Sequence, residues 1–142
     1  MVRILSFYLL VSLLSITSLG QSKDETEILK LLERQSGAWN RGDLDSFIIG
    51  YWENDSLMYI GKSGIRYGYA NTLDTYKKSY SDTAKMGKLS FETIHMKKLS
   101  PEYYFIVGKW FLKRTVGDVG GYYTLLFRKI RGKWVIIADH SS

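Results

Sequence analysis

Residues 120–142 read GGYYTLLFRKIRGKWVIIADHSS, and the rest of the chain is arranged around this stretch. Two runs of β-branched, aromatic and aliphatic residues flank the dipeptide Arg131-Gly132, where glycine can take the positive φ that a tight turn needs. The pattern predicts a β-hairpin. Its second strand ends in Asp139-His140-Ser141-Ser142, so polar and ionisable side chains stand at the tip of an otherwise apolar strand.

The register of this hairpin follows from its loop. If Arg131-Gly132 is the loop, the two strands pair residue by residue outward from it, and Thr124 lies opposite Asp139. Regular alternation then sorts the polar residues near the strand end onto the two faces of the sheet. We expect one face to carry Thr124, Arg128 and Asp139, and the other to carry Tyr123 and His140.

Helical spacing dominates the first part of the chain. Ser22 and Glu25 fit a capping box at a helix start, and Gly42 fits the left-handed position after its end. Asp43 can cap a second, short helix at once, and residues 69–80 return to helical spacing. The first helix has a stripe formed by Ile28, Leu31, Leu32, Gln35 and Trp39.

Strand patterns fill most of the remaining chain. Two short strands are predicted at residues 56–60 and 65–67, and residues 81–85 are expected to form a polar loop. Four long strands joined by short turns then form an antiparallel meander, at residues 88–98, 103–114, 122–130 and 133–140. The sequence therefore predicts an α+β domain in which a curved antiparallel sheet wraps on three N-terminal helices.

The long strands are apolar on both faces. In the second of them, one face carries Tyr103, Phe105, Val107 and Phe111, and the other carries Tyr104, Ile106, Trp110 and Leu112. A sheet that is apolar on both faces needs cover on both, and three short helices can cover only one. We therefore expect a homodimer through the other sheet face.

Several short motifs resemble those of a known family. They are Ala38-Trp39-Asn40-x-Gly42-Asp43, Tyr51, Gly87-x-Leu89-x-Phe91, Gly108-x-Trp110, Gly132-Lys133-Trp134-x-Ile136 and Asp139-His140-Ser141. This set resembles the SnoaL-like group of the nuclear-transport-factor-2-like (NTF2-like) superfamily and is most similar to the branch called domain of unknown function 4440. The calmodulin-dependent kinase association domain is similar too. The resemblance implies a cone-shaped α+β roll over residues 21–142, in a superfamily that hosts isomerases, cyclases, dehydratases and non-catalytic hubs.

The N-terminus has the pattern of an export signal. A short basic start precedes an apolar run at residues 4–19, and small residues Ser18 and Gly20 stand three and one positions before Gln21. We expect residues 1–20 to be a signal peptide and the mature protein to be periplasmic or secreted. An uncleaved anchor is the alternative. The chain has no cysteine, which excludes a lipoprotein, disulfides and thiol chemistry.

Charge and composition exclude several classes of function. The net charge of +6 is spread over single Lys and Arg positions, and no nucleic-acid motif accompanies it, so we interpret it as a solvated basic face. Two histidines without cysteine are too few for a metal site, and no nucleophile motif is present. We expect no metal, no cofactor, no nucleic-acid partner and no membrane contact after signal cleavage.

Two residues near the chain end are candidate catalytic groups. Asp139 can be a general base if burial at the strand end raises its pKa; the alternatives are a structural pair with Thr124 or Arg128, or a carboxylate that simply faces water. His140 beside Tyr123 can form a proton-transfer pair; the alternative is a histidine whose hydrogen bonds tie down the last strand.

Aromatic residues suggest a ligand pocket inside the cone. Aromatic walls with a few polar groups suit a small, mostly apolar molecule, and plain core packing is the alternative. The candidate ligand-binding residues are Tyr51, Tyr59, Tyr76, Trp110, Tyr123 and Arg128. Ketosteroid-isomerase-like members of the superfamily pair a tyrosine with a protonated acid, and no complete equivalent is visible in the sequence.

Three functions follow from these observations. The first is binding of a small apolar molecule in the cone, and the second is cofactor-free acid–base catalysis such as isomerisation, cyclisation or dehydration. The third is a non-catalytic dimeric interaction module. An open pocket containing Asp139 or His140 would favour the first two, whereas a cone filled by Tyr and Trp side chains would favour the third.

Overall fold

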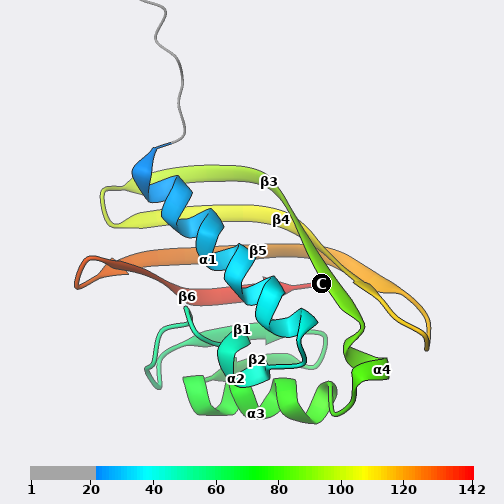
Figure 1. Cartoon of the computed structure of the whole chain (residues 1–142). Helices are drawn as coiled ribbons and strands as arrows, with labels where there is room; N and C mark the ends of the chain where they lie inside the picture. The colour runs from blue at the N-terminus through cyan, green and yellow to red at the C-terminus, as the bar shows by residue number, and fades with distance from the viewer. Residues whose placement is uncertain (1–21) are drawn as a thin grey trace, which may run out of the picture.

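The computed structural model describes residues 22–142, and the predicted signal peptide lies outside them. The helices are α1 (Lys23–Asn40), α2 (Leu44–Phe47), α3 (Tyr69–Ser79) and α4 (Thr83–Met86). The strands are β1 (Met58–Gly61), β2 (Gly64–Tyr67), β3 (Lys88–Ser100), β4 (Tyr103–Lys113), β5 (Val119–Ile130) and β6 (Lys133–Ser141) (Figure 1). Within residues 22–142, none of these helices has both the length and the apolar character needed to cross a membrane.

Both ends of α1 are fixed by side-chain hydrogen bonds. The predicted capping box is present, since the Glu25 N–H donates to Ser22 Oγ (3.2 Å) and the Ser22 N–H donates to Glu25 Oε2 (3.3 Å). At the other end, Trp39 Nε1 donates to the Met86 carbonyl (3.0 Å), and the Asn40 side chain bonds both backbone groups of Leu89. The end of α1 is therefore fixed to the start of β3.

The six strands form one curved sheet in the order β2-β1-β6-β5-β4-β3. All neighbours are antiparallel except β1 and β6, which run parallel, so the sheet is mixed and not wholly antiparallel as expected. The parallel pair arises because the chain returns from α2 to lie along the free edge of β6. The short helix α4 begins within the predicted polar loop at residues 81–85 and extends one residue beyond it, and Asp82 caps this helix by accepting from the Lys85 N–H (2.8 Å).

The hairpin of β5 and β6 has the predicted two-residue loop. Arg131 and Gly132 both have positive φ, at 50° and 75°, which is the combination that a tight hairpin turn requires. Ile130 pairs with Lys133 beside the loop, as predicted. The register is therefore correct where the hairpin begins.

A β-bulge then changes the register in the middle of β6. Leu126 and Phe127 are adjacent in β5, but their partners Ala138 and Ile136 are not, so Ile137 is an extra residue in β6. The bulge lies where β6 changes neighbours on its other edge. Ile136 pairs with the segment around Tyr51, and β1 takes over from Ala138 onward.

The bulge makes the predicted pairing beyond it wrong. Asp139 pairs with Leu125, and Thr124 pairs with His140. The extra residue turns Asp139 toward the helices, whereas Arg128, which precedes the bulge along the ladder, keeps its predicted pairing with Val135 on the opposite face. Asp139 is thus separated from Thr124 and Arg128, its two expected structural partners.

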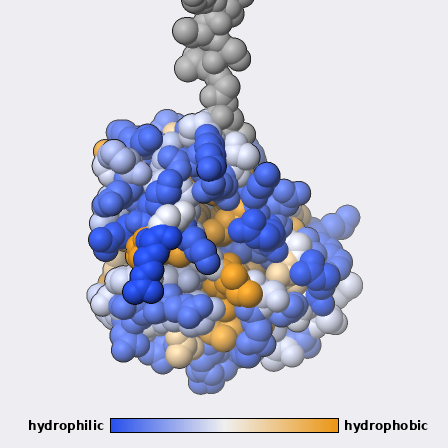
Figure 2. Space-filling view, turned by 60° about the vertical axis from the view of Figure 1, so that its left-hand side comes forward, coloured by the Kyte–Doolittle hydropathy of each residue, from blue (hydrophilic) through white to orange (hydrophobic). Residues whose placement is uncertain are grey.

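The two faces of the sheet have different surroundings. Figure 1 shows α1 crossing one face of the sheet, with α2 and α3 beside β1 and β2. No helix of residues 22–142 covers the other, outer face, whose central side chains are apolar and half-buried: Phe105, Val107, Leu126, Val135 and Ile137. Figure 2, in which the left-hand side of Figure 1 is turned forward, shows a largely hydrophilic surface with apolar side chains near its centre.

Candidate ligand pocket

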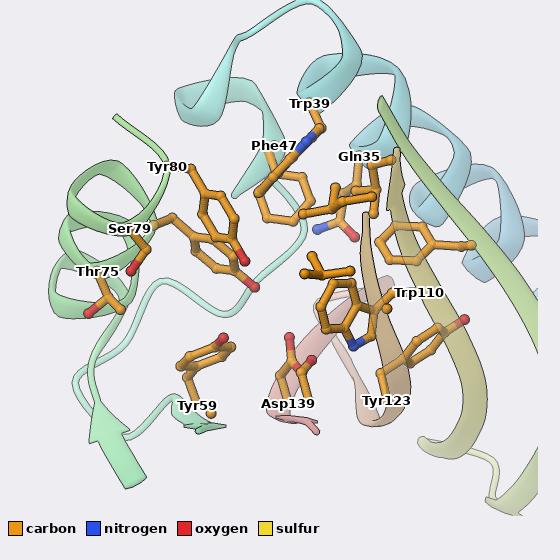
Figure 3. Close-up of a pocket in the computed structure, with 18 of the residues that line it drawn as sticks. Gln35, Trp39, Phe47, Tyr59, Thr75, Ser79, Tyr80, Trp110, Tyr123 and Asp139 are labelled. Atoms are coloured by element: carbon orange, nitrogen blue, oxygen red, sulfur yellow. The ribbon is translucent and has the colours of Figure 1, made fainter. Parts of the chain in front are cut away.

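The helices and the inner face of the sheet enclose a cavity of about 620 Å³. It opens between the end of α3, the turn between β1 and β2, and the strand ends around Arg114, Gly120 and Ser141. Aromatic side chains from α1, α3, β1 and the long strands form most of its wall (Figure 3). The cone is therefore open, and aromatic side chains do not fill it. A cavity of this size is typical of small-molecule sites.

Asp139 is the carboxylate inside this cavity. It lies in β6 between Leu125 of β5 and Tyr59 of β1, and it is 4% exposed. In Figure 3 its carboxylate points into the cavity, with Tyr59 on one side and Trp110 on the other. The β-bulge and the parallel β1–β6 pair together produce this placement.

Tyr51 is the main hydrogen-bond partner of Asp139. Its hydroxyl donates to Asp139 Oδ2 at 2.6 Å, and the Ser141 hydroxyl donates to Oδ1 at 3.2 Å. The backbone brings Tyr51 to β6, because the Trp52 N–H donates to the Ile136 carbonyl (2.9 Å) and the Ile136 N–H to the Gly50 carbonyl (2.8 Å). The tyrosine is thus held beside the carboxylate by the strand that carries it.

Burial dominates the electrostatics of the site. It raises the pKa of Asp139 to about 6, although the hydrogen bonds from Tyr51 and Ser141 oppose the shift. Burial, together with the nearby carboxylate, raises the pKa of Tyr59 to about 12 and the pKa of Tyr51 well above its usual value. The carboxylate therefore titrates near neutrality while the phenols around it stay protonated.

Asp139 has no cationic partner in the part of the chain that the structure describes. The ion pairs formed by residues 22–142 all lie elsewhere, on the surface and around Asp24. Lys62 and Arg114 line the mouth of the cavity, and Arg114 Nε donates to the Gly117 carbonyl (2.7 Å). The interior is thus acidic and the rim basic.

The cavity brings together most of the candidate residues named from the sequence. Tyr51, Tyr59, Tyr76, Trp110 and Tyr123 all line it, together with Asp139. The hydroxyls of Tyr51 and Tyr76 lie 3.4 Å apart, so a short chain of polar groups leads from α3 to the carboxylate.

The remaining candidates lie outside the cavity. Arg128 is on the outer face of the sheet, with its guanidinium 5.7 Å from the Tyr103 ring centroid. His140 follows Asp139 in the strand and is exposed, and Tyr123 pairs with Ser141 in its place. The predicted facing pair of Tyr123 and His140 is therefore absent, because the bulge turns them to opposite faces. Residues 22–142 contain no cluster of ligands that could hold a metal ion.

Several residues of the wall were not predicted from the sequence. Gln35 is 2% exposed and donates to the Ile49 carbonyl at 3.4 Å; a polar residue within the apolar stripe of α1 was the available signal. Tyr80 and Phe91 also line the cavity. No sequence signal identified these two residues as part of the cavity wall, because aromatic residues of the core and of a cavity wall occur in the same sequence pattern.

Fold and site together define the class of the protein: a cone-shaped α+β roll with helices on one sheet face and a pocket between the two. No family model and no curated protein matches the chain. A solved structure of an NTF2-like protein of unknown function from Shewanella oneidensis MR-1 is 44% identical, with a TM-score of 0.80. The match covers 84% of this chain and 98% of that one, so this chain belongs to the NTF2-like family.

More distant structures share the fold alone. A domain of unknown function with a cystatin-like fold from Nostoc punctiforme PCC 73102 is 15% identical, with a TM-score of 0.70, and the match covers 84% of this chain and 76% of that one. A ketosteroid isomerase-like protein from Erwinia carotovora atroseptica SCRI1043 is 18% identical, with a TM-score of 0.65 and coverage of 85% and 96%. The predicted fold class is thus confirmed.

Proposed function

We propose that the protein binds a small, mostly apolar molecule in the cavity and holds one polar group of that molecule against Asp139. The observation that carries this proposal is an open cavity of about 620 Å³ with aromatic walls and one buried carboxylate. Apolar walls with a few fixed polar groups are the usual composition of small-molecule sites. The placement of the chain in the SnoaL-like, domain-of-unknown-function-4440 branch is also a proposal, and it rests on the sequence motifs.

A thermal-shift screen of the mature protein against a broad metabolite set tests this proposal. A ligand that binds only the native state raises the melting temperature by mass action. Asp139→Asn is screened in parallel, and Asp45→Asn is the matched control because it also removes one carboxylate charge, but from a side chain that is 71% exposed. We expect hits that Asp139→Asn weakens and Asp45→Asn leaves unchanged; a screen without hits would contradict the proposal.

Acid–base catalysis is the second candidate function. A carboxylate with a pKa of about 6 that accepts a hydrogen bond from Tyr51 is suited to take and return a proton near neutral pH. Isomerisation, cyclisation or dehydration of a bound hit would need such a base and no cofactor. The test is product formation from each hit by mass spectrometry. Turnover that Asp139→Asn abolishes supports catalysis, and unchanged hits support binding alone.

The third function, a non-catalytic interaction module, is less well supported because the cone is open and not filled. The homodimer predicted from the sequence is nevertheless still a proposal. In this dimer a second copy of the chain covers the outer face of the sheet. The half-buried apolar side chains of β4, β5 and β6 on that face support it. Light scattering at micromolar concentration should give a dimer, which Phe105→Lys should dissociate. Ile49→Lys, at a residue that is 65% exposed elsewhere, is the control. A monomeric wild-type protein would refute this proposal.

Export is likewise a proposal, supported by the sequence at residues 1–20. Cleavage would leave Gln21 as the first residue of the mature protein, one position before the N-cap of α1. The intact mass of protein recovered from the periplasm or the medium shows whether cleavage has occurred. A mass that begins at Gln21 is expected, whereas a mass that retains Met1 would refute cleavage.

A further inference from the structure

The charge distribution in the cavity suggests the chemical class of the ligand. Asp139 accepts hydrogen bonds only from the neutral hydroxyls of Tyr51 and Ser141, and the ion pairs of the described residues do not include it. A buried carboxylate without a cation is costly, because two hydrogen bonds replace only part of its hydration. Within residues 22–142, the site therefore supplies this carboxylate with hydrogen bonds but with no salt-bridge partner.

A wholly apolar ligand would increase this cost. It would expel cavity water from beside the carboxylate and would form no hydrogen bond or ion pair in its place. A neutral hydroxyl could donate one hydrogen bond, and a cation would add the attraction of opposite charges at low dielectric constant. The physical ranking of head groups at Asp139 is therefore ammonium first, then hydroxyl, then an alkyl group, and a carboxylate last.

The walls next to Asp139 favour the same head group. Tyr59 and Trp110 lie on either side of its carboxylate in Figure 3, and Tyr76, Tyr80 and Tyr123 continue the wall. An aromatic ring attracts a cation placed over its face within about 6 Å of the centroid, and the attraction strengthens where water is excluded. Aromatic rings around one carboxylate are a recognised arrangement for binding ammonium groups.

We propose that the cavity binds an organic monocation, a protonated or quaternary amine on an apolar body, with the ammonium group at Asp139 between Tyr59 and Trp110. This inference rests on the proposed ligand-binding function. The rim supports a single positive charge in the ligand, because Lys62 and Arg114 would repel a second cation at the mouth. The apolar body of the ligand lies along the remaining aromatic wall toward that mouth.

Three probes that share one body test the head group: 4-phenylbutylamine, 4-phenylbutan-1-ol and 4-phenylbutyrate. Their dissociation constants are measured by calorimetry at pH 7.5. We expect the amine to bind at least about tenfold more tightly than the alcohol, and the carboxylate to bind most weakly. Equal affinities for amine and alcohol would overturn the cation inference and leave the pocket proposal intact. Absence of binding by all three would count against both.

Variants of Asp139 and Tyr59 test whether these residues cause the preference for the amine over the alcohol. Asp139→Asn should remove the advantage of the amine over the alcohol, while Asp45→Asn should keep it. If Asp139→Asn does not fold, Tyr59 gives an independent test, because Tyr59→Phe keeps a ring face and Tyr59→Leu does not. The amine should lose at least about threefold more affinity than the alcohol in Tyr59→Leu, and Tyr59→Phe should retain the difference. Equal losses of amine and alcohol would contradict a cation at this position.

The pH dependence of a quaternary probe, 4-phenylbutyltrimethylammonium, adds a test on the unmodified protein. This probe keeps its charge, so its affinity should fall about tenfold between pH 7.5 and pH 5 as Asp139 becomes protonated. A flat profile would overturn the inference. The groups around Asp139 are Tyr51, Tyr59, Tyr76, Tyr123 and, next to it in β6, His140. The phenols stay protonated in this range, and a His140→Gln control removes the imidazole.

Discussion

Asp24 and Asp139 lie near opposite ends of β6, and their carboxylates have opposite surroundings. Asp24 accepts from Lys129 Nζ (2.8 Å) and Trp134 Nε1 (3.0 Å), and the bond from Lys129 is the main reason that its pKa is lowered. Asp139 lies among phenols, forms no ion pair within residues 22–142, and has a pKa that burial raises to about 6. The first carboxylate joins α1 to the sheet, whereas the second lines the cavity.

The two carboxylates therefore affect the stability of the fold in opposite ways. At pH 7 the charge of Asp24 stabilises the native state, and this contribution is lost as the pH falls through its lowered pKa. The protonated form of Asp139 is the one that the fold favours, and its contribution is lost as the pH rises through about 6. An aspartate thus stabilises the native state in its ionised form near one end of β6 and in its protonated form near the other.

The largest expected effect comes from removing the charge of Asp139. A pKa raised by about two units corresponds to about 3 kcal/mol, so Asp139→Asn should stabilise the protein at pH 7 by up to about that amount. The gain should shrink toward zero as the pH falls to about 4. Urea denaturation of both proteins across this range measures it. A variant that is less stable at pH 7 would show that Asp139 is a structural residue like Asp24.

Gly108 gives the next largest effect, because the ring of Tyr123 in the cavity wall packs directly against it. A methyl group at this position would collide with the Tyr123 ring and with the Glu92 carbonyl, which is backbone and cannot easily yield. Overpacking of this kind costs about 1–3 kcal/mol. Gly108→Ala should therefore lower the midpoint of denaturation and shift Tyr123 at the cavity wall. Unchanged stability would mean that the cavity wall at Tyr123 and the backbone at Glu92 move aside easily.

Tyr51→Phe should lower the stability by about the same amount as Gly108→Ala. It removes the hydroxyl that donates to Asp139 at 2.6 Å, and a hydrogen bond to a charged group contributes about 1.5–3 kcal/mol. Because this bond favours the ionised form, its loss should also raise the pKa of Asp139 above about 6. An NMR titration of the carboxyl carbon follows the shift. A pKa that stays the same or falls would contradict the assigned role of Tyr51.

The smallest effect is expected from Asp24→Asn. Its partner Lys129 is one-third exposed, so solvent and salt screen the pair and the loss of stability should be below that of Tyr51→Phe. The loss should be greatest at low ionic strength and should vanish at acidic pH, where the effect of Asp139→Asn also vanishes; at pH 7 the two variants change the stability in opposite directions. Melting temperatures at two salt concentrations test this. A loss independent of salt would point to the Trp134 hydrogen bond instead of the charge.

Much of the fold could be predicted from the sequence, because its signals are local. The hairpin at residues 120–142 and the capping box at Ser22 depend on neighbours within a few positions, and both are confirmed. The bulge at Ile137 could not be predicted, since nothing in a run of aliphatic residues marks the extra one. Because the predicted register lacked this extra residue, it put Asp139 on the same face as Thr124 and Arg128 and paired His140 with Tyr123. Both predictions were wrong.

Several residues of the cavity wall could be predicted from the sequence, but the contacts between them could not. Aromatic residues at inward positions are recognisable, and five of the named ones line the cavity. The hydrogen bond between Tyr51 and Asp139 joins residues 88 positions apart, and it depends on the loop after α2 reaching β6. Such a contact follows from the tertiary arrangement alone. The burial that raises the pKa of Asp139 has the same origin.

The bulge also has a consequence for insertions and deletions. Loss of one residue from a regular strand turns every later side chain to the other face, and this usually destroys a site. Trp134 and Asp139 both face inward although five positions separate them, so β6 holds one residue more than regular alternation needs. Loss of one residue between them would restore the alternation and keep the carboxylate in the cavity. Among homologous proteins, a gap at this point of an alignment is therefore compatible with an unchanged site.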